Sequence, residues 1–337
     1  MAKKTKLTDI ATAAGVSIAT VDRVVNGRGG VTADKEAAVL AAAQTLGLDR
    51  KLALQPTRTL RVAVLMQPPG NPFHALLRDG VEALRDLYQP LNLQLLIHHL
   101  DPNQPAETAA RIRQLAGGHD GLILCAPDSP QIAEALRAVS GKSPVVTLAT
   151  DIPDSGRAAY IGPDDTRAGR VAADLMGVFL GAAGGEIVMM AGRLDIAGHR
   201  ARAEGFRAAL ARWHPQCALV EVVETGETLD AAAAHLRRAL RDRPGLRGIY
   251  LASVGSAGLV RTLEELGLGN QLHLITHELT PNRRALLAQR KLSAVIDQAP
   301  LTEVRLAGEA MARLLGRMPG RAQSVSTEIR IYMPENC

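Results

Sequence analysis

The residue types that could do chemistry in this chain are carboxylates, amides and guanidinium groups that follow short apolar runs. Such groups can form paired hydrogen bonds with vicinal hydroxyls, while an aromatic ring covers the apolar face of a sugar. Each residue alone has an ordinary alternative, since Asp128 could cap the next helix and Arg202 could be a surface charge. The candidates from position alone are Asn71, Phe73, His74, Asp128, Ser129, Asp151, Arg193, Asp195, His199, Arg200, Arg202, Ser256 and Gln298.

Motifs of the common catalytic classes do not accompany these residues. The chain has no G-x-x-x-x-G-K-[ST], H-E-x-x-H or G-x-S-x-G, and its G-S-A-G at 255–258 lacks the dinucleotide fingerprint. His98 and His99 lack a helical partner four residues away, and the three cysteines are far apart, which fits reduced thiols. We therefore expect that the protein is not an enzyme and that it holds neither a metal nor a cofactor. The alternative is a hydrolase or sugar kinase on the same fold.

Apolar runs that alternate with helical patterns must position these side chains. Such strands predict parallel sheets covered on both faces by helices, and their number suits two doubly wound lobes. Ligands of such sheets bind at the carboxyl ends of the strands. The expected strands are 60–66, 93–99, 121–126, 144–150, 158–162, 186–192, 218–224, 248–253, 273–278, 293–297 and 325–333, with helices that include 73–88, 166–181, 228–241 and 301–316.

A second pattern lies at residues 7–26, LTDIATAAGVSIATVDRVVN. Thr8 and Ser17 can each cap a short amphipathic helix, and Gly15 permits the turn between the two helices. The second helix leaves Ile18, Ala19, Thr20 and Arg23 off its apolar face, where they could meet base edges in a DNA major groove. An ordinary helical hairpin would share the glycine turn and the apolar face.

Charge favours the nucleic-acid interpretation. Residues 1–61 contain ten Lys or Arg and five acids, a net charge of +5, which equals that of the whole chain. A basic module on a neutral body is what phosphate neutralisation requires. Aromatic residues make up only 2% of the chain, too few for the stacking platforms that bind single strands. Double-stranded DNA is the expected partner.

The run T-D-I-A-x-x-A-G-V-S-x-A-T-V-x-R-V-V-N-G, followed by V-T and a third helix ending at Leu46-Gly47-Leu48, resembles the N-terminal domain of LacI/GalR-family transcriptional regulators. The resemblance implies a dimer that reads a roughly palindromic operator. Asp22 stands where the family usually has Ser, so this acid either points away from phosphate or selects against some operators. The expected DNA contacts are Thr8, Ser17, Ile18, Ala19, Thr20, Arg23, Asn26 and Arg28.

The later residues resemble the same family's effector domain, which is related to periplasmic sugar-binding proteins. N-P-F is similar to its sugar-binding signature, and R-A-R-A-E-G-F contains the family's Arg as Arg202. The resemblance adds Ser253 and Glu278 to the ligand candidates, in place of a frequent Asn and Asp, and supports Asp151 and Gln298. It implies a sugar or polyol effector, whose identity stays open because purines bind relatives of this fold.

The expected domains are a helix-turn-helix domain at 1–48, a linker at 49–59 and an effector-binding domain at 60–337. The first lobe is expected at about 60–163 plus 299–323, and the second at about 164–298 plus 324–337. Pro56 and the missing Y-x-P-N motif predict a flexible or differently built hinge, with Leu52 and Leu54 as the nearest minor-groove wedge candidates.

The sequence as a whole predicts a homodimeric transcriptional regulator, most simply a repressor, whose operator affinity depends on a small effector. Whether the effector induces or corepresses is open. A secreted sugar carrier is the rival interpretation, but MAKKTKLTDI has no apolar signal-peptide core and no run of 18 apolar residues occurs. We therefore expect a cytoplasmic protein without a membrane partner.

Overall fold

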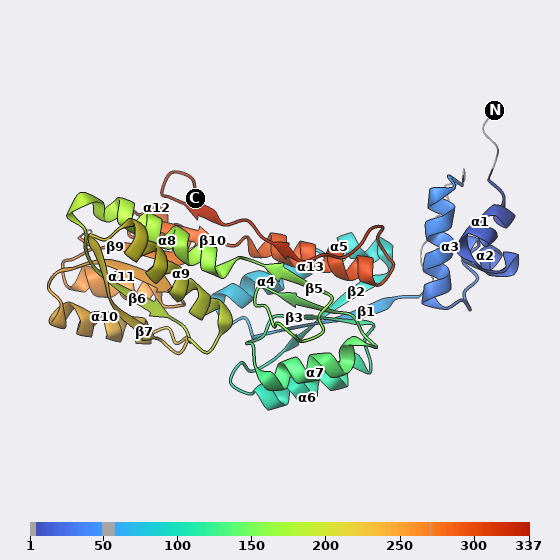
Figure 1. Cartoon of the computed structure of the whole chain (residues 1–337), viewed down its shortest axis with the longest axis horizontal. Coiled ribbons are helices and arrows are strands. Elements are labelled where there is room, and N and C mark those ends of the chain that lie inside the picture. The colour runs from blue at the N-terminus through green and yellow to red at the C-terminus, as the bar shows by residue number, and fades with distance from the viewer. Residues whose placement is uncertain (1–4, 49–57, 270) are drawn as a thin grey trace.

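The computed structural model describes residues 5–48, 58–269 and 271–337. Its first three helices, α1 (Leu7–Ala14), α2 (Ile18–Val25) and α3 (Ala33–Thr45), form a small head at one end of the molecule (Figure 1). Ile10, Val21 and Val39 are fully buried at its centre. The predicted all-helical head is confirmed, whereas the predicted hinge at 49–59 lies almost wholly outside the described residues.

The first lobe contains a six-stranded sheet in the order β11-β5-β4-β3-β1-β2, and every pair in it is parallel. Helices cover both faces, and β3 and β4 are therefore buried along their whole length. The strands are β1 (Leu60–Met66), β2 (Leu93–His99), β3 (Gly121–Leu124), β4 (Val145–Leu148), β5 (Ala159–Gly162) and β11 (Val325–Ser326). The helices are α4 (Pro72–Ala83), α5 (Arg85–Tyr88), η1 (Gln89–Leu91), α6 (Pro105–Ala116), α7 (Pro130–Ser140) and α13 (Pro300–Leu314).

The second lobe repeats this plan with the sheet order β12-β10-β9-β8-β6-β7, in which only β12 is antiparallel to its neighbour. Its strands are β6 (Gly185–Ala191), β7 (Cys217–Glu224), β8 (Leu246–Ala252), β9 (His273–His277), β10 (Ala294–Asp297) and β12 (Arg330–Tyr332). Its helices are α8 (Asp165–Leu180), η2 (Gly181–Ala183), α9 (Ala197–Trp213), α10 (Ala231–Asp242), α11 (Ser256–Glu265) and α12 (Pro281–Ala288). The predicted fold class, a helical head followed by two α/β lobes, is confirmed.

The chain passes between the two sheets three times: after β5, after β10 and after β11. The predicted strand at 325–333 is in fact two strands, because β11 completes the first sheet and β12 completes the second. The third crossing therefore follows Ser326, a little later than the expected boundary at 323. The expected helix at 73–88 is likewise divided into α4 and α5.

Two glycines bring α8 and α9 unusually close together. A Cβ atom on Gly169 would lie 2.1 Å from the Arg202 carbonyl oxygen, and one on Gly205 would lie 2.1 Å from the Thr166 carbonyl oxygen. Only glycine permits this approach. The contact places Arg202 of α9 beside Asp165, the first residue of α8.

No helix within the described ranges combines the length and apolarity needed to span a bilayer.

Candidate functional site

The head presents α2 as an exposed helix on a fixed turn. Gly15 ends α1 in the left-handed conformation at φ 63°, and the Ser17 hydroxyl accepts a hydrogen bond from the Thr20 amide at 3.1 Å. Val21, Val24 and Val25 are buried, as predicted. Ile18 is 52% exposed, and Ala19 and Arg23 are also exposed. The first turn of α2 is therefore free to contact another molecule.

The predicted cap of α1 was wrong. Thr8 lies inside α1, which begins at Leu7, and Lys6 occupies the N-cap position. The Asp9 carboxylate accepts a hydrogen bond from the Lys6 amide at 2.9 Å, and this bond closes the first turn. The Thr8 side chain is exposed, so a DNA contact from it stays a prediction.

Asp22 points toward two other candidate DNA contacts. Its carboxylate lies 3.0 Å from Nη1 of Arg28 and accepts a hydrogen bond from Nδ2 of Asn26 at 2.7 Å. Asp22 lies in the last turn of α2, and Asn26 and Arg28 follow that helix, next to glycines 27, 29 and 30, which all have positive φ. The acid is thus neutralised within the head.

A second candidate site is a cavity of about 90 Å³ between the carboxyl ends of the two sheets. This volume is smaller than the about 300–1,000 Å³ of pockets for drug-sized molecules, so the cavity suits a smaller ligand. The first lobe contributes Asn71, Phe73 and His74, which follow β1. The second lobe contributes Arg202, Ser253, Glu278 and Gln298. These predicted residues do come together around one cavity.

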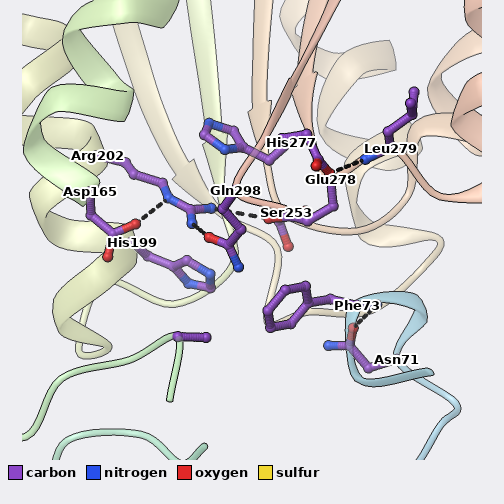
Figure 2. A network of polar contacts seen from close by, with 12 residues as sticks. Asn71, Phe73, Asp165, His199, Arg202, Ser253, His277, Glu278, Leu279 and Gln298 are labelled. Atoms are coloured by element: carbon purple, nitrogen blue, oxygen red, sulfur yellow. Dashed lines mark hydrogen bonds and ion pairs between the residues drawn. The ribbon is translucent and has the colours of Figure 1, made fainter. Parts of the chain in front are cut away.

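Arg202 organises the wall of the second lobe (Figure 2). Its Nε donates to Asp165 at 2.7 Å, its Nη2 donates to the Gln298 amide oxygen at 2.9 Å, and its Nη1 lies 3.5 Å from Glu278. The side chain is 9% exposed, so the surface-charge alternative does not hold. Burial lowers the pKa of Arg202, but the carboxylates of Asp165 and Glu278 outweigh burial and hold its pKa above the usual value.

Glu278 is held between two arginines. Arg283 donates from Nη1 to the other Glu278 carboxylate oxygen at 3.1 Å and from Nη2 to the Ser253 carbonyl at 2.5 Å. Glu278 has φ of 54°, a left-handed conformation that is costly for a residue with a side chain and persists only where the surroundings enforce it. Arg283 is therefore the support that fixes both Glu278 and the end of β8.

The first lobe supplies the apolar wall of the cavity. Asn71 caps α4 by accepting a hydrogen bond from the Phe73 amide at 3.0 Å, and Pro72 occupies the first helical turn. In Figure 2 the Phe73 ring lies across from the group formed by Arg202, Gln298 and Ser253. His74 packs edge-on against Phe73, and burial lowers its pKa to about 4, so the imidazole is neutral at pH 7.

Three predicted ligand residues do not line the cavity. Asp151 is occupied by Arg157, whose Nη2 lies 2.6 Å from Oδ2, and by the Thr147 hydroxyl at 3.1 Å. Asp128 accepts a hydrogen bond from the Ala197 amide of the other lobe at 2.8 Å, and Arg200 lies 3.8 Å from it. The cap expected for Asp128 on its own following helix is provided by Ser129 instead. The prediction that Asp128, Asp151 and Arg200 line the cavity was therefore wrong.

Sequence reasoning missed three charged residues of the cavity: Asp165, Glu227 and Arg283. Asp165 and Glu227 follow β5 and β7, so the rule used for the other strand ends would have found them. Arg283 lies inside α12, where no strand end marks it. His199, a candidate already from its position after β6, also lines the cavity. Burial, followed by the charge of Arg202, lowers its pKa to about 4.

Within the part of the chain that the structure describes, no group of three histidines, cysteines or acids is arranged to hold a metal ion.

A helix-turn-helix head attached to two lobes with a polar cavity between them defines a DNA-binding regulator with a ligand-binding domain. The model of the periplasmic binding protein domain matches residues 62–318, and the model of bacterial regulatory proteins of the lacI family matches residues 6–49. This chain belongs to the lacI family and is a DNA-binding transcriptional regulator.

Known proteins resemble the chain over most of its length. Catabolite control protein A of Priestia megaterium is 26% identical over 317 residues, which cover 91% of this chain and 90% of that protein. GanP, a glucose-galactose binding protein of Geobacillus stearothermophilus, has a TM-score of 0.74 at 20% identity and covers 83% of this chain and 99% of its own. A solute binding protein of Burkholderia graminis in complex with D-arabinose has a TM-score of 0.76 at 21% identity, covering 83% and 97%. The structural likenesses show the fold.

Proposed function

We propose that a neutral, polyhydroxylated small molecule, a sugar or polyol, binds in the cavity between the lobes and sets the operator affinity of the head. The observation that carries this proposal is the charge balance around Arg202. Arg202 and Arg283 are matched by Asp165 and Glu278, so this group offers directed hydrogen bonds without net charge. A phosphate or carboxylate would find no free cation in it, whereas hydroxyl groups suit it well.

The rest of the cavity supports the same ligand class. Phe73 gives an apolar surface opposite these polar groups, as a sugar ring with one apolar face requires. Two proteins of the same fold have sugar ligands. GanP is named a glucose-galactose binding protein, and the Burkholderia graminis protein is in complex with D-arabinose. Burial raises the pKa of the Cys125 thiol in the cavity lining well above its usual range, so we propose no nucleophilic role for it.

Coupling to DNA follows from the two lobes. A ligand that contacts both lobes favours one relative orientation of the lobes over another. It changes operator affinity by no more than the difference between its affinities for these two orientations. On the DNA side we propose contacts from Ser17, Ile18, Ala19, Thr20 and Arg23 on α2. Thr8, Asn26 and Arg28 complete the proposed surface through phosphates. We propose a cytoplasmic location, because the protein must reach operator DNA.

We propose that two copies pair through the first lobe. Strand β2 is an edge of its sheet, and edges that are left open invite pairing. A groove of about 770 Å³ runs along it, lined in part by Leu95, Leu96 and Ile97. Leu87 beside it is 55% exposed. A homodimer of two such faces would place two heads on the half-sites of a palindromic operator.

We propose that the chain has three parts: the head at 1–48, a linker at 49–59 and the two-lobed domain at 60–337.

A thermal-shift screen with sugars and polyols tests the effector proposal. A compound at 100 times its Kd stabilises the folded state by about 2.7 kcal/mol. We expect at least one compound to stabilise the wild type, and the stabilisation to be lost in Arg202→Ala and reduced in the milder Gln298→Ala. Arg207→Ala removes an exposed arginine of the same helix and should bind like the wild type. A panel without any stabilising compound, or a stabilisation that persists in both variants, would overturn the proposal.

A further inference from the structure

Glu227 is a cavity residue whose carboxylate is left without a hydrogen bond among the described residues. It follows β7, lines the cavity and has a side chain that is 18% exposed. The polar atom that the structure places near it is Nε2 of His199, 4.0 Å from Oε1. Arg202, Asp165, Glu278 and Gln298 all have direct partners. Glu227 therefore differs from the other polar groups of this wall.

A glycine makes room for this pair of side chains. A Cβ atom on Gly192, directly after β6, would lie 2.5 Å from Cε1 of His199 and 2.8 Å from Cγ of Glu227. Any other residue there would push the two side chains away from the end of the strand. The juxtaposition of Glu227 and His199 is thus built into the backbone of the cavity.

The gap between the two side chains fits one bridging oxygen. A separation of 4.0 Å is too long for a direct hydrogen bond, but two bonds of about 2.8 Å that meet at one atom span it. Nδ1 of His199 lies 3.0 Å from the Arg193 amide nitrogen and 3.2 Å from its carbonyl oxygen, so Nε2 donates in one tautomer and accepts in the other. When the Arg193 amide donates to Nδ1, Nε2 carries the proton, and a hydroxyl in the gap can accept from Nε2 and donate to the Glu227 carboxylate. Carboxylates only accept and ammonium groups only donate.

We propose that Glu227 and His199 together bind one hydroxyl of the effector and so determine which sugar or polyol this regulator accepts. The inference rests on the proposed function of the cavity and adds a recognition element to it.

The electrostatic surroundings suit a hydroxyl. Burial raises the pKa of Glu227, Arg193 opposes this shift, and Glu278 and Asp195 add to it. Arg193 itself is paired with Asp195 through Nη2 at 2.5 Å and is not free to neutralise Glu227. A hydroxyl meets this wall without adding charge.

The test measures Kd by titration calorimetry for defined probes. The parents are D-ribose, D-xylose, D-arabinose, D-glucose, D-galactose and xylitol, each with its monodeoxy and amino-deoxy analogues. The proteins are the wild type, Glu227→Leu and Glu227→Gln, with Asp230→Asn as a matched control in the same loop. Asp230 is exposed and does not line the cavity. Thermal unfolding without ligand shows whether each variant is folded.

In the wild type, we expect removal of one particular hydroxyl from a parent sugar to weaken binding tenfold or more, because two polar groups then lose their partner. In Glu227→Leu the same removal should cost less than twofold. Glu227→Gln, whose amide donates and accepts, should keep the discrimination, as should Asp230→Asn. Equal discrimination by the wild type and Glu227→Leu would overturn the inference, and so would a wild type that prefers the amino-deoxy analogue. If no parent binds the wild type, the proposed function of the cavity fails first.

Discussion

At the scale of single residues, Asp22 shows how an acid can be placed in a DNA-binding head. Phosphate would repel an isolated carboxylate. Here Arg28 and Asn26 both bond to it, so the acid competes with DNA phosphates for Arg28, one of the proposed DNA contacts. The pair is 66% and 38% exposed, so its contribution to stability is small. Its effect should appear in DNA binding instead.

Asp22→Ser should release Arg28 toward the DNA backbone. We expect tighter binding to nonspecific duplex and a plot of log K against log salt concentration that is steeper by about one, the slope of one added phosphate contact. Fluorescence anisotropy at several salt concentrations measures both. Asp34→Ser removes an equal charge from the start of α3 without touching Arg28. Equal slopes for the two variants would show that the pairing has no role, and unchanged operator selectivity in Asp22→Ser would rule out its part in choosing operators.

The sequence predicted the cavity residues where chain topology alone decides their place. Asn71, Phe73 and Gln298 follow parallel strands, and all such strand ends meet at one edge, whereas Ser253 and Glu278 were predicted from the family resemblance. Sequence position does not tell whether a side chain already has a partner nearby. Asp151 shares the same edge but is bonded to Arg157, six residues along the chain. Glu227 and Asp165 could have been found, because they obey the same rule.

At the scale of elements, the start of α9 is completed by the opposite lobe. Its N-cap residue, Ile196, has no side-chain acceptor, and the carboxylate that accepts from the Ala197 amide belongs to Asp128 after β3. A second bridge joins Arg193 to Asn103 at 2.7 Å. A helix cap contributes about 1 kcal/mol. In this protein that contribution exists only while the lobes are close together.

Asp128→Ala should therefore weaken effector binding without disturbing either lobe. We expect about a fivefold rise in the Kd of the sugar that most stabilises the wild type, from the loss of about 1 kcal/mol in the closed arrangement. X-ray scattering without ligand should show a larger radius of gyration. Ser129→Ala is the control, because it removes the cap of α7 within its own lobe. It should lower stability and leave Kd unchanged. The explanation is wrong if both variants bind alike.

Strand positions were largely predictable, since buried parallel strands are continuous apolar runs. The expected ranges 60–66 and 93–99 coincide with β1 and β2. The run at 325–333 could not be divided in advance, because its two halves have similar patterns and differ only in the sheet that they join. That difference depends on the tertiary arrangement of the lobes.

At the scale of the whole molecule, the three crossings meet near a buried acid, Glu303 of α13. Its side chain is fully buried, one carboxylate oxygen accepts from Thr327 of the third crossing at 3.1 Å, and the other has no partner among the described residues. Burial raises the pKa of Glu303 well above its usual value; Thr327 and Arg202 oppose this shift, while Asp165 and Asp297 add to it. The junction between the lobes thus contains a carboxyl group whose burial favours the protonated form.

This acid should make stability depend on pH. Its pKa is higher in the folded state than in the unfolded state, so its contribution is complete below the unfolded value, near 4.5, and is lost as pH rises through the folded value. Glu303→Gln keeps a neutral side chain of similar shape. We expect its free energy of unfolding to fall less than that of the wild type between pH 5 and pH 8, measured by urea denaturation. Glu134→Gln, an exposed change on α7, should follow the wild type. Parallel curves for Glu303→Gln and the wild type would exclude this role.

The division of the last strand run between two sheets has a consequence for synthesis on the ribosome. The second lobe is nearly continuous from α8 to β10, whereas the first lobe lacks α13 and β11 until that whole stretch has been translated. Domains usually fold in the order in which they emerge. Here the lobe that begins first cannot be completed first. Its half-built sheet stays with one face of β5 and the neighbouring strands uncovered until α13 and β11 have been made. This sheet is therefore the part of the nascent chain most in need of a chaperone.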